Sequence, residues 1–175
     1  VRVEVVADTP DPPKPDAIFP NNWVSFHPDG RAFVYPLAVA TRRAERRADV
    51  LARLEPVHGT REVVDLSGLE RHGEFLEGTG SLLLDHVARV AFACRSPRTT
   101  PGALRSFAER SGYRVVTFEA ALDGAAVYHT NVVMALAPGV AVLAEPLVAD
   151  PGPLRAALAP REVLVVDAAQ VRAFA

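Results

Sequence analysis

The 175-residue sequence is poor in cysteine, in net charge and in long apolar runs, and each shortage excludes a class of protein. A single cysteine cannot close an internal disulfide or supply a thiolate zinc site, and it is typical of a reducing compartment. The 19 basic residues are outnumbered by 21 acidic ones, so no positive excess remains for nucleic acid or an anionic membrane. No apolar run approaches the ~20 residues of a membrane span. We expect a soluble, cytoplasmic protein that binds neither nucleic acid nor membrane.

Apolar residues are plentiful, at 49% of the chain, which is enough for one compact core but not for two ordinary domains. We therefore expect a single domain over residues 1–175. Val1–Val6 already alternates as a half-buried strand does, and Gln170–Ala175 has no polar tail, although natural termini are usually polar and frayed. We expect a piece of a longer polypeptide, incomplete at both ends.

The order strand, strand, helix, strand occurs three times in the predicted elements. The last strand of each copy begins near residue 62, 113 or 162, a spacing of roughly 50 residues that is typical of repeated supersecondary units. The proline-rich segment 8–22 before the first copy is predicted to be an extended loop, because each proline removes a backbone donor. The predicted copies comprise residues 24–26, 31–37, 41–54 and 62–66; then 81–84, 90–94, 101–110 and 113–118; then 131–136, 140–143, 153–158 and 162–166.

Such a unit has too little apolar area to fold alone, so several must pack around a shared axis. We expect an α/β protein built as an incomplete, propeller-like ring with exposed apolar faces and edge strands. The helix predicted over 41–54 begins at a Thr41 cap and ends before Pro56. Its four arginines are expected to form a solvated face around Glu45 and Asp49. A core stripe is expected on its other side, at Ala44, Ala48 and Leu51.

Two polar segments between the repeats contain groups suited to acid–base chemistry. Glu77 precedes Gly78-Thr-Gly80, where glycines let the backbone approach a ligand, and its carboxylate could accept hydrogen bonds from a cationic or amide-like substrate. The competing interpretation is an exposed loop carboxylate. His129 lies at the entrance to an apolar strand and could transfer protons, or could be a core histidine with satisfied nitrogens. Asn131, two residues on, would point to the same side of an extended strand.

Other candidates are weaker on sequence grounds. Arg98 could bind a substrate carboxylate through its two-pronged guanidinium, or be a solvated loop residue, and Asn22 beside Trp23 suits a planar polar ligand or loop structure alone. Cys94 lies in an apolar strand, where burial raises a thiol's pKa, so we interpret it as structural. None of the histidines has acidic or thiol partners at metal-ligand spacing, and we predict no metal site.

Four motifs occur in order along the chain: PNNWVSFH at 20–27, LEGTGS at 76–81, SPRT at 96–99 and YHTNV at 128–132. Together they resemble the amidinotransferase superfamily, and the resemblance covers almost all of the chain. Within it, the match is closest to bacterial citrulline utilisation hydrolases, which are related to arginine deiminase and dimethylarginine dimethylaminohydrolase. The resemblance implies the pentein fold, an α/β-propeller of five ββαβ units, of which about three are present here.

The resemblance also implies a set of roles. Glu77 would bind the guanidino or ureido nitrogens, His129 would be the general acid and base, and Arg98 would contact the substrate carboxylate. Asn22 and Asn131 fall where arginine deiminases carry aspartates. Because two amides remove negative charge from the pocket, a neutral ureido group is favoured over a cationic guanidinium, and so citrulline over arginine.

The mechanism implied is covalent and needs no cofactor: a thiolate attacks the ureido or guanidino carbon, and His129 protonates the leaving nitrogen and then activates water. The family's nucleophilic cysteine would lie beyond Ala175, and Cys94 is not at its position, so we expect this chain alone to be inactive. Two other interpretations stay open: a catalytically silent protein that holds an amino acid, and a packing module. The expected partner is a small amino-acid substrate, and homo-oligomerisation is left open.

Overall fold

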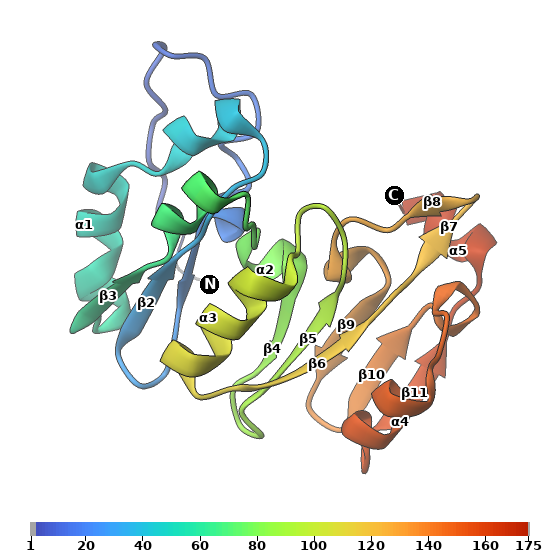
Figure 1. Cartoon of the computed structure of the whole chain (residues 1–175). Coiled ribbons are helices and arrows are strands. Elements are labelled where there is room, and N and C mark those ends of the chain that lie inside the picture. The colour runs from blue at the N-terminus through green and yellow to red at the C-terminus, as the bar shows by residue number, and fades with distance from the viewer. Residues whose placement is uncertain (1–2, 175) are drawn as a thin grey trace.

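The computed structural model describes residues 3–174, which form three small sheets of the same design (Figure 1). In each sheet the first two strands are an antiparallel hairpin, and the third returns parallel to the second after a helix. The first sheet contains β1 (Val24–Phe26), β2 (Arg31–Val34) and β3 (Glu62–Asp65); the second β4 (Leu82–Asp85), β5 (Val90–Cys94) and β6 (Arg114–Phe118); the third β9 (Met134–Ala137), β10 (Val140–Leu143) and β11 (Glu162–Val165).

Each parallel return crosses over through one helix. These crossover helices are α1 (Ala48–His58), α3 (Pro101–Ser111) and α4 (Gly152–Leu158). Gly59 and Gly112 end the first two in the left-handed conformation that glycine adopts without a Cβ penalty. The remaining elements are the hairpin β7 (Ala121–Leu122) and β8 (Ala125–Ala126), the helix α5 (Ala168–Phe174), and the short turns η1 (Pro20–Asn22), η2 (Ala40–Glu45), η3 (Ser67–His72), α2 (Gly78–Ser81), η4 (Thr130–Val132) and η5 (Glu145–Leu147).

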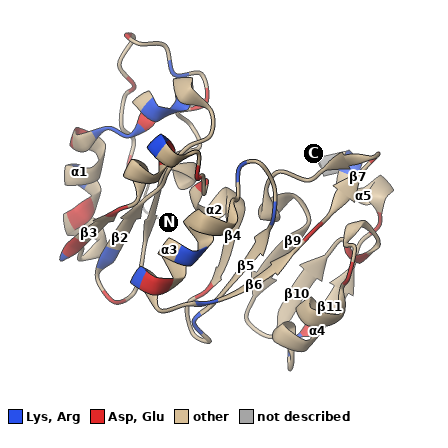
Figure 2. Cartoon of the chain, viewed as in Figure 1, with Lys and Arg blue, Asp and Glu red and all other residues tan. Residues whose placement is uncertain are grey.

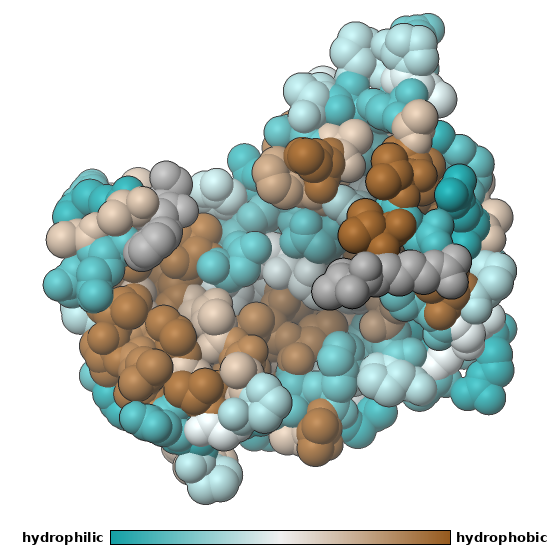
Figure 3. All heavy atoms as spheres, turned by 180° about the vertical axis from the view of Figure 1, so that it is seen from behind, coloured by the Kyte–Doolittle hydropathy of each residue, from teal (hydrophilic) through white to brown (hydrophobic). Residues whose placement is uncertain are grey.

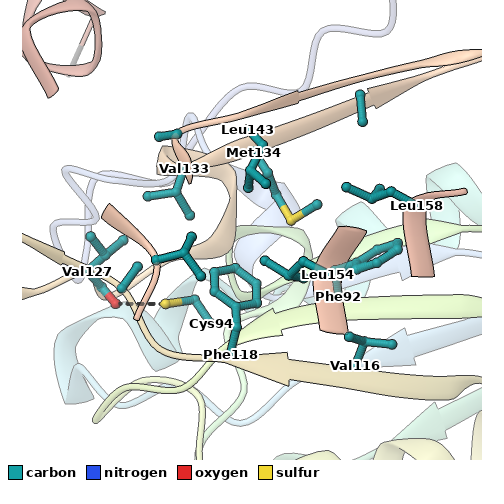
Figure 4. Close-up of a cluster of buried hydrophobic side chains, with 14 of the residues drawn as sticks. Phe92, Cys94, Val116, Phe118, Val127, Val133, Met134, Leu143, Leu154 and Leu158 are labelled. Carbon is teal, nitrogen blue, oxygen red and sulfur yellow. Dashed lines mark hydrogen bonds between the residues drawn. The ribbon is translucent and has the colours of Figure 1, made fainter. Parts of the chain in front are cut away.

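The two larger core clusters lie between neighbouring sheets, so each unit buries its apolar side chains against the next. β5 is the central strand of the middle sheet, and all five of its residues are buried, as its unbroken apolar sequence predicts for a strand covered on both faces. Phe92 packs with Phe118 and Leu143 between the second and third sheets (Figure 4). Phe33 and Phe107 belong to the cluster that joins the first and second sheets.

The first crossover differs most from the prediction. The helix expected from Thr41 is interrupted: η2 covers 40–45, α1 begins at Ala48 without a side-chain cap, and it runs through Pro56 to His58. The expected core stripe is only partly correct: Ala48 is exposed and α1 buries no residue completely, whereas Leu51 is half-buried and packs against the cluster that contains Trp23. The solvated arginine face is wrong as well: Arg42 is buried against Glu45, the opposite of its expected place.

The N-terminal segment also departs from the prediction. Of the strand expected over Val1–Val6, residues 1 and 2 lie outside the described residues, and residues 3–6 form no strand. Val3 and Val5 remain largely exposed. The loop that follows agrees with the expectation until η1, a single 3-10 turn at Pro20–Asn22.

The surface carries charge of both signs over the same elements (Figure 2), as the near balance of acidic and basic residues implies. Seen from behind, apolar residues gather on the side where the third sheet lies (Figure 3), and Leu164 and Val165 of β11 are about half exposed. Within residues 3–174, no helix combines the length and the apolar character needed to cross a bilayer.

Candidate functional site

The candidate site is built from three short turns that occupy equivalent places in the three sheets. η1, α2 and η4 each come just before the first strand of their sheet, and α2 packs against both of the others. Close approach is possible because α2 contains two glycines. A Cβ on Gly78 would lie 2.1 Å from the Asn21 carbonyl oxygen, and one on Gly80 would lie 2.6 Å from Asn22 Oδ1.

The central contact of the site joins Glu77 to His129. Glu77 Oε2 lies 2.7 Å from His129 Nε2, and both side chains are buried, at 0% and 7% exposure. The other oxygen, Oε1, accepts the Ala38 backbone N–H at 3.2 Å, and Arg98 Nη1 donates to Oε2 at 3.4 Å. Because an ionised carboxylate can only accept, Nε2 carries a proton in this pair, and Nδ1 is the ring atom left to take up or release a second proton.

The charge state of Glu77 follows from these contacts. Burial alone would raise its pKa, because a carboxylate loses hydration in the interior. The hydrogen bond and charge of His129, the charge of Arg98 and the Ala38 N–H outweigh burial, and together they lower the pKa of Glu77 below its ordinary value. The buried acid is therefore ionised at neutral pH.

A cavity of about 310 Å³ opens directly beside this pair. Asn22, Arg98, His129 and Asn131 line it, whereas Glu77 lies behind His129 and does not itself line the cavity. The remaining lining residues are Asp16, Phe19, Asn21, Arg42, Tyr128 and Val132. The structure thus brings all five sequence-predicted residues to one place, four as walls and one as their buried support.

Asn131 lines the cavity, but the local structure that places it there differs from the predicted one. Residues 130–132 form a 3-10 turn and not an extended strand, so the alternation argument that put Asn131 on the same side as His129 was wrong. Asn131 is exposed at the cavity wall, while Asn22 is buried and accepts a hydrogen bond from Asn21 Nδ2 at 3.3 Å. The two amides therefore occupy unequal environments.

Arg42 is the lining residue that sequence reasoning missed. Its Nε and Nη2 atoms each donate to a different oxygen of Glu45 at 2.8 Å, and the pKa of Arg42 is raised chiefly by that hydrogen-bonded pair. Asp16 Oδ2 lies 3.8 Å from its Nε. The sequence does not distinguish Arg42 from the other three arginines of the run, because its burial depends on tertiary packing.

Tyr128 was also passed over, and it contacts two members of the site. The Arg98 guanidinium carbon lies 4.6 Å from the centroid of its ring, within cation–π range, and the ring lies 4.8 Å from that of His129. Ser96 fixes the two loops to each other: its hydroxyl accepts the Arg98 N–H at 3.1 Å and donates to the Tyr128 carbonyl at 2.9 Å. The sequence signal that could have identified Tyr128 is its position directly before the predicted His129.

Cys94 does not belong to the cavity. It is fully buried in the core between the second and third sheets, and its thiol lies 3.5 Å from the Val127 carbonyl oxygen (Figure 4). Burial raises the pKa of Cys94 to about 11, so the thiol is protonated at neutral pH. The interpretation of Cys94 as structural agrees with this environment.

A larger cavity, of about 540 Å³, lies between the N-terminal segment and Trp23. It is mainly apolar, and neither histidine nor cysteine lines it, so it offers no acid–base pair. Within the part of the chain that the structure describes, no group of three or more potential metal ligands occurs.

Comparison with known families settles the relationship suggested by the motifs. The model of the family described as N,N dimethylarginine dimethylhydrolase, eukaryotic, matches residues 1–175. The chain belongs to this dimethylarginine dimethylhydrolase family. Membership of the amidinotransferase superfamily, predicted from four short motifs, is thereby confirmed. No curated protein sequence matches the chain.

Solved structures similar to this dimethylarginine dimethylhydrolase family member share its fold at low sequence identity. ArgZ, an arginine dihydrolase from the ornithine-ammonia cycle in cyanobacteria, superposes with a TM-score of 0.73 at 18% identity, over 95% of this chain and 26% of its own. AgrE in complex with ornithine and NAD+ gives 0.70 at 18% identity, over 90% of this chain and 22% of its own.

A third similar structure is a dimethylarginine dimethylaminohydrolase variant in adduct with S-methyl-L-thiocitrulline. It gives a TM-score of 0.62 at 16% identity, over 87% of this chain and 54% of its own. The N-terminal domain of ArgZ, solved with its substrate, is covered to 55%. The chain thus spans about a quarter of whole ArgZ and about half of the single domains that it matches.

Proposed function

We propose that this chain forms part of the site of a hydrolase that cleaves a carbon–nitrogen bond of a guanidino amino acid such as arginine or dimethylarginine. The observation that carries the proposal is the buried Glu77–His129 pair beside a cavity that two arginines also line. Family membership supports the substrate class.

The reaction proposed is covalent and proceeds in two halves. A thiolate attacks the guanidino carbon, the bond to one nitrogen breaks, and protonated His129 gives its proton to that leaving nitrogen. In the second half His129 takes a proton from water, the resulting hydroxide attacks the same carbon, and the carbon–sulfur bond breaks to restore the thiolate. From a guanidino substrate the products are an amine or ammonia and a ureido amino acid. From a ureido substrate the same two halves give ammonia and a carbamate, which decomposes to an amine and carbon dioxide. The nucleophile must come from outside residues 1–175, because Cys94 is buried and protonated.

Glu77 supports both halves in this scheme through His129. This role replaces the direct contact with the substrate's nitrogens that the resemblance implies, because Glu77 does not line the cavity. Its ionised carboxylate, hydrogen-bonded to Nε2, stabilises the imidazolium that forms each time Nδ1 accepts a proton. Arg98 and Arg42 supply positive charge on the cavity wall, and a guanidinium binds a carboxylate through two hydrogen bonds. We assign the substrate's α-carboxylate to Arg98, because Nε and Nη2 of Arg42 already donate to Glu45.

A finer proposal concerns the choice between guanidino and ureido substrates. The amides of Asn22 and Asn131 stand on the cavity wall without negative charge, and the charge of Asp16 is close to Arg42. A neutral ureido group then needs less compensating charge than a guanidinium, so citrulline is the favoured substrate. The Asn22→Asp substitution should shift the ratio of kcat/KM toward arginine by about tenfold. A wild-type enzyme that hydrolyses arginine faster than citrulline would contradict the citrulline preference and leave the guanidino hydrolase proposal intact.

The main test is a product assay on the full encoded polypeptide. Arginine, dimethylarginine and citrulline are supplied in turn, and released ammonia or amine is measured together with the amino-acid product. We expect turnover of at least one substrate and a loss of at least about 100-fold in kcat with His129→Ala. Absence of turnover with all three substrates would reject the hydrolase.

A silent amino-acid-binding protein is the second candidate, and the buried position of the single thiol favours it. Calorimetry distinguishes the two: the silent protein binds citrulline or arginine without releasing product. A module that only packs would give no binding heat.

We also propose that the three sheets are units of one propeller-type domain over residues 1–175, with further units needed to close the ring. The superposition on pentein-fold dihydrolases supports this arrangement. We also propose a cytoplasmic location, because a free cysteine is typical of a reducing compartment.

A further inference from the structure

A set of buried hydroxyls lies beneath the cavity, with Ser81 at its centre. The Ser81 hydroxyl accepts the backbone N–H of Glu77 at 3.0 Å and the Thr99 hydroxyl at 2.7 Å, and it donates to the Arg98 carbonyl at 3.1 Å. One donor and two acceptor sites are all that a serine hydroxyl has, so every one of them is used.

Thr130 connects the same group to the histidine turn. Its hydroxyl donates to the Ser81 carbonyl at 2.5 Å and accepts the Cys94 N–H at 2.7 Å. Thr130 follows His129 directly in the chain. Ser81 and Thr130 are both 0% exposed, so water cannot replace any of these bonds if one partner is removed.

Hydrogen bonds to Ser81 therefore join the segments that contain Glu77, Arg98 and Thr130. Glu77 lies four residues before Ser81, Arg98 follows after a whole hairpin, and His129 follows the next helix and strand. Neither Ser81 nor Thr130 lines the cavity, so neither can touch a substrate there.

We propose that Ser81 and Thr130 are positioning residues that set the distance between the Glu77 carboxylate, the His129 ring and the Arg98 guanidinium. The inference rests on the proposed function for its catalytic meaning. Its physical basis is that hydrogen bonds that are all satisfied and buried hold their partners in one arrangement. A shift of about 1 Å in such a site can cost about 100-fold in rate.

The test compares two substitutions at one position in the full encoded polypeptide. Thr130→Val keeps the shape but removes the hydroxyl, whereas Thr130→Ser keeps the hydroxyl. We expect Thr130→Val to lower kcat/KM by about 10- to 100-fold, mainly through kcat, and Thr130→Ser to stay within about threefold of the wild type. Ser81→Ala should behave like Thr130→Val.

Ser111→Ala is the matched control. Its hydroxyl is just as buried, at 1% exposure, and accepts the Tyr113 N–H at 3.1 Å, but it lies at the end of α3 away from the cavity. We expect this variant to lose stability without a change in kcat/KM per folded molecule. If Ser81→Ala does not fold, the Thr130 pair decides the question.

A second measurement separates this inference from the proposed function. The proton on His129 Nε2, held by Glu77, gives a ring resonance that nuclear magnetic resonance detects whether or not the protein is an enzyme. We expect this resonance to shift or to broaden in Thr130→Val and to persist unchanged in Thr130→Ser and Ser111→Ala. An unchanged resonance with unchanged kinetics in Thr130→Val would overturn the positioning role, whereas a wild type that never turns over substrate would reject the hydrolase alone.

Discussion

At the scale of single residues, the site depends on ionisable groups that are buried with a dedicated partner. Glu77 has His129, and Arg42 has Glu45. A buried charge without compensation is costly, so Glu77 depends on His129 to stay ionised inside the protein, and Arg42 depends on Glu45. Removing one member of a pair should therefore change both the stability of the fold and the chemistry of the site. Measuring stability as a function of pH separates the first effect from the second.

Glu77→Gln tests this coupling through stability. The pKa of Glu77 is lowered in the folded protein, so the ionised acid stabilises the fold above its ordinary value of 4.5, and this contribution is lost as pH falls through the lower folded value. We expect Glu77→Gln to destabilise the protein by about 2 kcal/mol at pH 7 and by progressively less below pH 4.5. Denaturant unfolding across that range measures it. A wild-type advantage that grows toward acid would contradict the assignment.

His27 should give a pH dependence in a different window. Burial is the main cause that lowers its pKa to about 4, the charge of His86 adds to it, and Asp29 opposes it. Its Nδ1 is buried without a hydrogen-bond partner. Below its ordinary value of 6.5 the unfolded chain takes up a proton that folded His27 refuses, so stability should fall from pH 6.5 to 4 by up to about 3 kcal/mol.

His27→Gln should flatten this acid-side fall, because glutamine can keep one hydrogen bond to Ser25 but does not titrate. His72→Gln, at an exposed position, is the control and should follow the wild-type curve. Identical slopes between pH 6.5 and 4 for the wild type and His27→Gln would show that His27 is not the group responsible.

At the scale of elements, the close packing of α2 against its neighbours is the feature that assembles the site. Gly80 does not have a positive φ, so its need for glycine comes from space alone: a Cβ there would lie 2.9 Å from His129 Nδ1. We expect Gly80→Ala to cost about 1–3 kcal/mol and to lower kcat/KM by at least about tenfold, since the ring or Asn22 must move. Unfolding and steady-state kinetics measure both.

Gly68→Ala is the matched control, because its only close neighbour is the flexible end of Arg71 at 3.3 Å. We expect it to be nearly neutral in both measurements. Equal effects of the two substitutions would mean that crowding at α2 is not what Gly80 prevents.

Strands were the elements that sequence patterns predicted best. The predicted strand 90–94 matches β5, and the predicted strand 140–143 matches β10, because alternation and apolar runs are local signals. The break between η2 and α1 was not predictable in this way. In this segment Arg42 pairs with Glu45 inside the fold, which no local pattern encodes.

The residues of the candidate site also divide into those that local sequence patterns predict and those that depend on tertiary packing. Glu77 and His129 were selected from residue type and glycine context, and the structure brings them into contact although 52 positions separate them. Arg42 escaped notice because helical periodicity places it on a solvated face. Tertiary packing overrides periodicity where a charged side chain gains a buried partner.

At the scale of the whole molecule, the open question is which parts of the reaction this chain can supply. It supplies the proposed acid–base residue His129 and two arginines at the wall of one cavity, with the carboxylate partner Glu77 buried behind His129. Its single thiol is buried in the core between the second and third sheets, with its pKa raised to about 11. Acid–base and binding groups without a nucleophile cannot complete a covalent reaction.

We therefore expect residues 1–175 expressed alone to release no product from arginine, dimethylarginine or citrulline, whereas the full encoded polypeptide turns over at least one of them. Cys94→Ala should leave the kcat of the full polypeptide within about twofold, because the thiol packs in the core and does not reach the cavity. Ammonia or amine release measures both. Turnover by the 175-residue chain that Cys94→Ala abolishes would reverse the assignment, and Cys94 would then have to leave its buried position to attack the substrate.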